Sequence, residues 1–241
     1  MHFHENLVYH GTNLFSAKLI EQHGVWIYAQ REATDFGRGY YLTDNLEQAV
    51  DWAKVRSLTP QISRSTLSMI GCTKKEFLHH PDTKVPALLQ YRIHPSELIK
   101  LNGLIFPLPS HPDWQVASKV WHSFVTLNRK GGNLHSFDYV FGPVSKNKIS
   151  PNGMIDYFPE KNQLSLHTAS SLQSLMDIKI FTVGFPEEKE SIEISPPLSA
   201  YYKFIKNRLL QKSRISPLLS FPSQSVLEEP PSYWADLLND Q

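Results

Sequence analysis

The chain has 241 residues, of which 41% are hydrophobic and 20% are charged, and its formal net charge is +1. That is the composition of an ordinary globular protein, and the length is sufficient to bury a core without disulfides or metal ions. Cys72 is the single cysteine, which excludes an intramolecular disulfide and a cysteine-based zinc site, and the near-neutral charge excludes a global attraction to nucleic acid.

The first predicted elements are a strand and a helix. Residues 7–9 form a short β-type run, and apolar residues at helical spacing follow it until Gly24, which is a natural helix stop. Residues 29–38 are polar and contain glycine, so they predict a loop before the next strand.

A second strand and helix follow that loop. Residues 39–43 predict the strand, and either Asp44 or Asn45 predicts the N-cap of the helix. The apolar face of the helix is expected to comprise Leu46, Ala49, Val50 and Ala53. From about 57 to 85 the chain is rich in Ser, Thr and Pro without a sustained period, which predicts a long insertion with at most one short helix.

The middle of the chain contains further predicted strands around a long helix. Strands are predicted at 87–93 and 137–144, and one or two more are expected within 98–106. Residues 114–128 predict a helix, and its recurring apolar positions are Val116, Val120, Phe124 and Leu127. Trp121 and Phe124 of this helix are expected to be core residues.

Three elements are predicted to end the core, after which the composition changes. An alternating strand at 163–167 and a short helix at 170–176 precede a last strand at 178–183. The chain then becomes rich in Pro, Glu and Ser. We therefore predict one domain at residues 1–183 and a Pro-rich, partly helical extension at residues 184–241.

The predicted extension carries an apolar stripe at helical spacing, made of Leu198, Tyr201, Tyr202, Ile205 and Leu209. A second apolar patch lies at residues 233–238. An exposed stripe of this kind is typical of a surface that binds a partner. A helix that packs back on the domain would have the same pattern, so both interpretations remain open.

Neither a membrane segment nor a metal site is expected. The first residues lack the basic and apolar regions of a signal peptide, and no uncharged apolar run approaches the roughly 18 residues that span a bilayer. We therefore expect a cytoplasmic protein. The eleven histidines are scattered and form no H-x-x-x-H pair, so no bound metal is expected.

Two motifs have the residue types of a nucleotide site. His10-Gly11-Thr12 ends the first predicted strand, where glycine lets a ligand approach the backbone. Residues 35–41, Asp-Phe-Gly-Arg-Gly-Tyr-Tyr, place two glycines and an arginine before an aromatic pair, and arginine can pair with phosphate. The Asp-Phe-Gly triplet also occurs in protein kinases, but the H-R-D loop, the glycine-rich loop and the β3 lysine of a kinase are missing.

These motifs occur in the order found in a known superfamily. Residues 36–44 resemble the F-G-K-G-I-Y-F-A-D run of poly(ADP-ribose) polymerase-like catalytic domains, in which a His-Gly-Thr/Ser motif precedes that run. The chain is also similar to a bacterial family of ADP-ribosyltransferase-like proteins. That resemblance covers roughly residues 7–180 and rests on six segments in order: Tyr9–Thr12, Asp35–Thr43, Trp52-Ala53, Trp121–Arg129, Phe137–Val144 and Gln163–Thr168.

The resemblance implies a role for each of three site residues. His10 would hydrogen-bond the adenosine-side ribose of NAD⁺, and Tyr41 would stack on the nicotinamide ring. The third position is often Glu in the superfamily, and here it is Gln163. An amide can hydrogen-bond the nicotinamide ribose, but it cannot lend negative charge or act as a base. Glu160 is the alternative third residue.

Further residues of the two motifs are implied to bind NAD⁺. The backbone of Gly11 would pair with the nicotinamide carboxamide. The remaining members of this set are Thr12, Arg38, Gly39 and Tyr40. The implied fold is α+β, an ADP-ribosyltransferase-like split β-sandwich in which two small antiparallel sheets, flanked by helices, have the NAD⁺ cleft between them.

The implied activity is transfer of ADP-ribose from NAD⁺ to a protein or nucleic-acid acceptor. A mono-transferase is expected, because chain elongation usually relies on the third-position Glu. By analogy, such a protein would be an intracellular toxin or effector, and an antitoxin or chaperone would cover its extension. An NAD⁺ glycohydrolase and a non-catalytic NAD⁺- or ADP-ribose-binding module remain alternatives.

Overall fold

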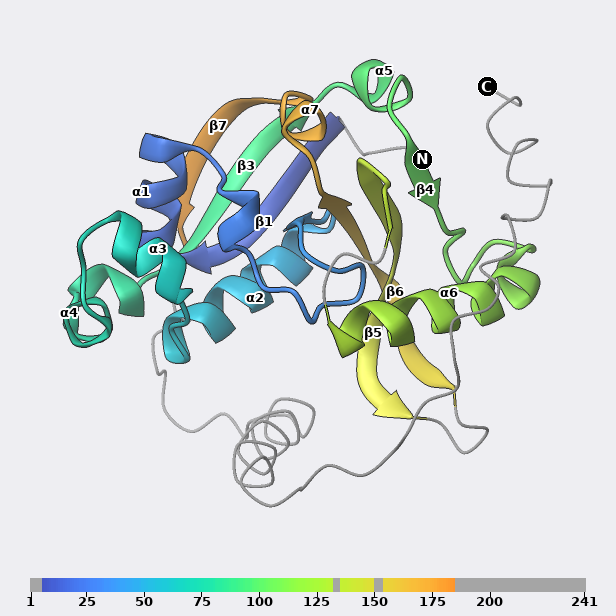
Figure 1. Cartoon of the computed structure of the whole chain (residues 1–241), viewed down its shortest axis with the longest axis horizontal. Helices are drawn as coiled ribbons and strands as arrows, with labels where there is room; N and C mark the ends of the chain where they lie inside the picture. The colour runs from blue at the N-terminus through green and yellow to red at the C-terminus, as the bar shows by residue number, and fades with distance from the viewer. Residues whose placement is uncertain (1–5, 132–134, 150–153, 185–241) are drawn as a thin grey trace. The chain divides into compact units, whose positions relative to one another are not determined.

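The computed structural model describes residues 6–131, 135–149 and 154–184, and these residues form an α+β structure with two β-sheets (Figure 1). The first sheet has the order β1-β3-β7 and comprises β1 (Leu7–Asn13), β3 (Pro86–Ile93) and β7 (Leu175–Thr182). Both of its strand pairs are antiparallel. The predicted α+β class is therefore confirmed.

The second sheet has the order β2-β6-β5-β4. Its strands are β2 (Tyr40–Leu42), β6 (Ile155–Leu166), β5 (Tyr139–Ile149) and β4 (Gly103–Ile105). The expectation of two antiparallel sheets was wrong for one pair, since β4 runs parallel to β5. The chain reaches β5 from β4 by way of the long helix α6, the kind of crossover that a parallel pair requires.

A short bridge joins the two sheets. The backbone nitrogen of Tyr9 in β1 donates to the carbonyl oxygen of Thr43 (2.7 Å), and the nitrogen of Thr43 donates to the carbonyl oxygen of Tyr9 (3.0 Å). The His-Gly-Thr motif therefore lies beside the end of β2, which follows the glycine-rich motif.

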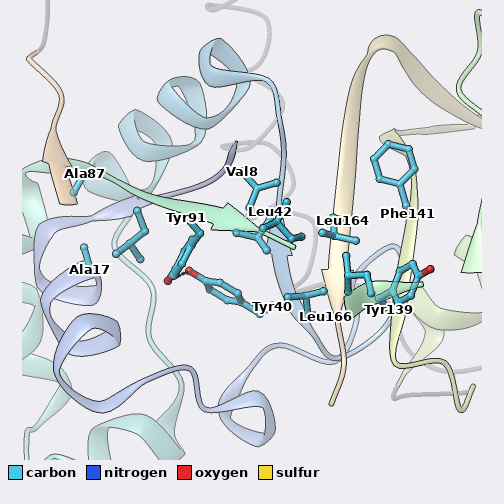
Figure 2. Close-up of a cluster of buried hydrophobic side chains, with 13 residues drawn as sticks. Val8, Ala17, Tyr40, Leu42, Ala87, Tyr91, Tyr139, Phe141, Leu164 and Leu166 are labelled. Atoms are coloured by element: carbon cyan, nitrogen blue, oxygen red, sulfur yellow. Dashed lines mark hydrogen bonds between the residues drawn. The ribbon is translucent and has the colours of Figure 1, made fainter. Parts of the chain in front are cut away.

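One apolar core lies between the sheets and α1 (Figure 2). Alternate residues of β2 and β6 point into it, among them Tyr40, Leu42, Leu164 and Leu166. Figure 2 shows Tyr40 pointing toward Tyr91 of β3, and their hydroxyl oxygens are 2.9 Å apart. This bond pairs two hydroxyl groups that would otherwise be costly to bury.

The predicted stop of the first long helix at Gly24 and the predicted cap of the second are confirmed, and Asn13 is an N-cap that was not predicted. In α1 (Leu14–His23) the side chain of Asn13 accepts from the nitrogen of Ser16, and Gly24 ends the helix with a φ of 75°. In α2 (Leu46–Leu58) the N-cap is Asn45 rather than Asp44, because the side chain of Asn45 accepts from Gln48. Ala49 and Ala53 of α2 are buried, as expected, whereas Leu46 is 49% exposed.

The segment at 57–85 is more ordered than the sequence predicts. It contains two helices, α3 (Arg64–Met69) and α4 (Lys74–His79), and the 3-10 turn η3 (Pro81–Lys84). These helices are too short to show a sustained helical period of apolar residues. Their N-cap residues are the sequence feature that could have predicted them. Ser63 caps α3, while Thr73 and Glu76 form a capping box on α4.

Three shorter elements also differ from the predicted boundaries. The segment at 98–106 contains only the strand β4, and the helix α5 (Pro95–Leu98) lies before it. The helix expected at 170–176 is the single turn α7 (Ala169–Leu172). The short 3-10 turn η2 (Ile27–Ala29) precedes the predicted loop.

The helix α6 (Trp114–Lys130) buries only part of what was predicted: Trp121 is buried and the Phe124 ring packs beside that of Phe106, but the other three recurring apolar positions are exposed. Val116, Val120 and Leu127 are 66%, 38% and 43% exposed. The buried positions are instead Trp114, Ala117, Trp121, Val125 and Asn128. The two tryptophan rings pack edge-to-face on Tyr157 of β6, with centroids 4.9 and 6.0 Å away, so the larger aromatic surface determines which face is buried.

Among the described residues, no helix is both long and apolar enough to cross a membrane. Apart from Gly184 itself, the predicted extension at 184–241 lies outside the described residues, and so do its apolar stripe and its patch at 233–238. The domain boundary and the two interpretations of the extension therefore stay predictions.

Gly11 is required by the packing of α2 against β1. A Cβ at this position would lie 2.8 Å from the backbone nitrogen of Ala53 and closer still to the carbonyl oxygen of Ala49. Both atoms belong to the helix backbone and cannot move aside as a side chain could. Glycine therefore lets the helix lie directly on the strand that carries the His-Gly-Thr motif.

We expect Gly11→Ala to lower the free energy of unfolding by about 1–3 kcal/mol, the usual cost of overpacking. Urea unfolding followed by circular dichroism would measure it. Gly184→Ala is the matched control, because nothing lies within 4 Å of a Cβ at that residue. Equal stability of the two variants would contradict this account of the contact.

Candidate functional site

One face of the second sheet is polar. Along β6 the residues Leu164 and Leu166 point into the core, so Gln163 and Ser165 point to the opposite face. Tyr41 of β2 is paired with Ser165 across the ladder and shares that face. The alternation predicted at 163–167 is therefore confirmed, although Gln163 lies well inside β6 and not at the start of a strand.

The segment of residues 30–39, called the covering segment below, packs on this polar face through a buried carboxylate. Asp35 is 7% exposed. Its Oδ1 accepts from Nε of Arg129 in α6 (2.7 Å) and from the hydroxyl of Ser145 in β5 (2.9 Å). Its Oδ2 accepts from the backbone nitrogen of Ser145 (3.0 Å) and from Nε2 of Gln163 (2.8 Å). We call Asp35, Arg129, Ser145 and Gln163 the Asp35 network.

The Asp35 network determines how the amide of Gln163 is oriented. Its Nε2 also donates to the carbonyl oxygen of Pro143 (3.1 Å), so both amide hydrogens are used. The reversed orientation would direct the amide oxygen at a carboxylate and a carbonyl, which cannot donate. What Gln163 can offer a ligand is therefore its carbonyl oxygen, a hydrogen-bond acceptor.

Glu160 is not an obvious substitute for Gln163. It lies in β6 and not in a loop, and its side chain is exposed. Its carbonyl oxygen accepts from Nδ2 of Asn45 at 3.5 Å. The Asp35 network includes Gln163, three residues further along the strand, and does not include Glu160.

Tyr41 holds the covering segment by its hydroxyl group. The hydroxyl accepts from the backbone nitrogen of Phe36 (2.9 Å), donates to the carbonyl oxygen of Gly37 (2.8 Å) and lies 2.8 Å from Oγ1 of Thr34. Burial raises the pKa of Tyr41 far above its ordinary value, so the phenol is neutral. The Phe36 ring stacks near the Tyr41 ring, at a centroid distance of 6.4 Å.

His10 is a neutral acceptor beside Tyr41. Its Nδ1 lies 2.7 Å from the carbonyl oxygen of Tyr41, so Nδ1 carries the hydrogen and donates it, which leaves a lone pair on Nε2. Burial lowers the pKa of His10 to about 4, so the ring is uncharged at neutral pH. The ring centroid is 4.6 Å from that of Tyr40.

The backbone of Gly11 projects toward the same place. The nitrogen and the oxygen of Tyr9 both bond to Thr43, so they point away from β3. Backbone direction alternates with a period of two in an antiparallel ladder, so the N–H and the C=O of Gly11 point to that side as well. Gly11 is half-buried, and it offers one donor and one acceptor next to His10.

The other residues that the sequence predicts to bind NAD⁺ lie in different environments. Thr12 is 6% exposed at the end of β1. Tyr40 is 1% exposed and its side chain belongs to the core, on the opposite face of the sheet from Tyr41. Arg38 pairs with Glu32 within the covering segment.

Gly39 lets the covering segment approach β6 closely. A Cβ at Gly39 would lie 2.8 Å from Nδ1 of His167 and closer to the hydroxyl of Ser165. His167 is 6% exposed, and its Nδ1 donates to the carbonyl oxygen of Arg38 (2.7 Å). Burial lowers the pKa of His167 to about 4, because the buried ring is harder to charge.

The structure thus brings the His10 ring, Gly11 and the backbone carbonyl of Tyr41 together at the bridge between the sheets, and it links Gln163 to the Tyr41 side chain through residues 34–37. Sequence reasoning missed Asp35 as the partner of Gln163, and it missed Arg129 and Ser145 as the partners of Asp35. Asp35 and Arg129 each belong to one of the six segments on which the resemblance rests, and this was the sequence signal that could have identified them. Because 94 residues separate Asp35 from Arg129, their contact cannot be predicted from local sequence patterns.

The polar face is closed in this structure, since Gln163 is only 8% exposed. A cavity of about 600 Å³ lies elsewhere, between α1 and the α3–α4 region, and its lining includes Phe15, Trp26 and Met69. A second cavity, of about 290 Å³, lies over β1, β3 and β7. No predicted site residue lines either cavity. NAD⁺ could reach Gln163 only if the covering segment moved.

A family model described as "Protein of unknown function (DUF3990)" matches residues 7–158, which is more than half of the chain. The match includes the His-Gly-Thr motif and the covering segment, and it ends within β6 before Gln163. No curated protein and no solved structure matches the chain.

The two buried histidines predict a pH dependence of stability. The pKa of His167 is about 4 in the folded protein and about 6.5 ordinarily, so the unfolded chain binds more protons between these values. Stability is therefore complete above about pH 6.5 and falls as the pH drops toward 4. His10 acts in the same direction.

We expect His167→Asn to reduce this pH dependence, because the Asn amide can still donate to Arg38 but does not titrate. The slope of unfolding free energy between pH 4 and 6.5 should fall by up to about 1.4 kcal/mol per pH unit, the value for one proton. Urea unfolding at several pH values would measure it. The exposed His79→Asn is the control, and an equal slope for His167→Asn and the wild type would overturn the assignment.

Proposed function

We propose a function from the site itself, because the chain belongs to the DUF3990 family, which is described only as a protein of unknown function. The function is mono-ADP-ribosyl transfer from NAD⁺ to a protein or nucleic-acid acceptor. The observation that carries it is the grouping of the Gly11 backbone, the His10 ring and Tyr41 at the bridge between two sheets. This arrangement supports an ADP-ribosyltransferase-like split β-sandwich.

The chemical character of these groups matches the nicotinamide half of NAD⁺. A primary carboxamide has donors and an acceptor, and the N–H and C=O of Gly11 are complementary to it. Tyr41 supplies an aromatic ring for stacking on nicotinamide. The lone pair on Nε2 of His10 can accept from a ribose hydroxyl, and its low pKa of about 4 keeps that lone pair available at neutral pH.

Gln163 completes the proposed site. Its carbonyl oxygen is the acceptor for a hydroxyl of the nicotinamide ribose, and this contact would hold the sugar while an acceptor group attacks C1′. The bond from C1′ to the acceptor forms as the bond to nicotinamide breaks, nicotinamide leaves as a neutral molecule with its bonding electron pair, and the proton of the acceptor group is released to solvent. The protein supplies orientation and electrostatic support for this displacement.

Two other functions use the same site. Water in place of the macromolecular acceptor would make the protein an NAD⁺ glycohydrolase. A neutral amide at Gln163 also fits a module that binds NAD⁺ or ADP-ribose without turnover. A role as an intracellular, cytoplasmic toxin, with an antitoxin or chaperone on residues 184–241, is part of the main proposal and rests on the resemblance alone.

We expect His10→Ala and Tyr41→Ala each to weaken NAD⁺ binding or turnover more than tenfold, about 1.4 kcal/mol. Tyr41→Phe keeps the ring and should retain NAD⁺ affinity within about threefold. Calorimetry for binding and nicotinamide release for turnover are the measurements. Tyr28→Ala is the matched control, since Tyr28 is 88% exposed. Unchanged affinity and turnover in both alanine variants would mean that the site lies elsewhere.

Incubation with NAD⁺ labelled in its adenylate and with cell lysate would separate the three functions. The transferase should label a macromolecule, and protease or nuclease digestion of the product then identifies the class of acceptor. Release of nicotinamide with only free ADP-ribose labelled would indicate the glycohydrolase. Saturable binding without nicotinamide release would indicate the binding module, and no binding at all would refute the proposed function.

A further inference from the structure

We propose that Asp35 is the carboxylate of this site, a positioning residue that fixes the amide of Gln163 and places a negative charge one hydrogen bond behind it. The inference rests on the proposed function, since it assigns a role to Gln163 in that reaction. It also makes a claim about the pair of side chains that can be tested without NAD⁺. The claim is that this pair requires one acid and one amide, so that the two could be exchanged between positions 35 and 163 but two acids could not be accommodated.

Asp35 is built into the site more firmly than a surface acid would be. It is 7% exposed and accepts hydrogen bonds from three residues on three elements, Arg129, Ser145 and Gln163. The guanidinium of Arg129 supplies the opposite charge that a buried carboxylate needs. The hydrogen bonds of Ser145 and Gln163 occupy its remaining acceptor positions.

The contact with Gln163 has a directional consequence. Nε2 of Gln163 donates to Oδ2 of Asp35 (2.8 Å) and to the carbonyl oxygen of Pro143 (3.1 Å). Both partners only accept, so the amide oxygen must point away from them, which leaves it available to accept from a ribose hydroxyl. A hydrogen bond from an amide to a carboxylate also polarises the amide and strengthens its oxygen as an acceptor.

The same distances explain why Glu would be unfavourable at position 163 in this chain. A carboxylate there would place an oxygen within hydrogen-bond distance of Oδ2 of Asp35 and of the carbonyl oxygen of Pro143, with no hydrogen between them. Two buried like charges at this separation repel strongly. With Asp35 present, only a donor such as the amide of Gln163 satisfies both acceptors.

The test is a double-mutant cycle with Asp35→Asn, Gln163→Glu and the combined variant, read first as stability. Each single change should destabilise the fold, because Asp35→Asn removes the charge that pairs with Arg129 and Gln163→Glu adds a second acid. In the Gln163→Glu background, Asp35→Asn should instead stabilise, because it removes the repulsion. Asp177→Asn, an exposed acid on the other sheet, is the control and should keep the same small effect in both backgrounds.

The second measurement is nicotinamide release by the folded proteins. Asp35→Asn should lower kcat more than tenfold while KM stays within about threefold, since it disturbs the orientation of Gln163 and not the contacts of His10 and Tyr41. Asp177→Asn should leave both constants unchanged. A purely structural acid would give the stability pattern without this split between kcat and KM.

The outcomes of the two measurements are distinguishable. If the wild type releases no nicotinamide, the proposed function fails, while the stability cycle still tests the exchange of acid and amide. If Asp35→Asn destabilises equally in both backgrounds, the exchange is overturned. If the wild type turns over and Asp35→Asn keeps its kcat, the positioning role is overturned, whatever the cycle gives.

Discussion

A buried carboxylate has to be paired, and the pairing of Asp35 determines how the polar side of this protein is assembled. The acid is carried by the covering segment, whereas its partners come from α6, β5 and β6. Four parts of the chain must therefore meet at one point for the charge to be buried at all. Leaving a buried charge without its partner typically costs several kcal/mol. That penalty favours a single arrangement of the covering segment over the sheet.

The period of two along β2 and β6 separates the core from the site. Neighbouring residues of β2 have opposite surroundings, since Tyr40 bonds to Tyr91 in the core and Tyr41 bonds to the covering segment on the polar face. A shift of one residue in the pairing with β6 would exchange these positions. Core packing therefore fixes the register that places Tyr41 and Gln163 on the same face.

Much of this arrangement follows from local sequence, and the rest depends on contacts between distant residues. The strands β1, β2, β3 and β7 and the helix stop at Gly24 were predictable, because period and capping are local properties. The burial of Trp121 was predicted as well, but that of Trp114, Ala117 and Val125 was not, since Val116 and Val120 offer a second apolar face at helical spacing and the contacts with Tyr157 decide between the faces. The motifs predicted His10, Tyr41 and Gln163 as candidate site residues, but not the Asp35 network that orients Gln163. That network joins Asp35 to residues 94, 110 and 128 positions away.

The groups that would bind a nucleotide are the same groups that hold the covering segment in place. Tyr41 makes three hydrogen bonds to residues 34–37, and Gln163 is reached only beneath Asp35. A ligand that approaches both residues therefore competes with the segment, and its affinity is reduced by the free energy needed to displace it. Gly37, with a φ of 80°, and Gly39 lie where the chain would have to bend. The Tyr41 contacts are made to residues 34, 36 and 37, which flank Asp35 on both sides, so a ligand that replaces them must shift the neighbours of Asp35 while Arg129, Ser145 and Gln163 hold its carboxylate.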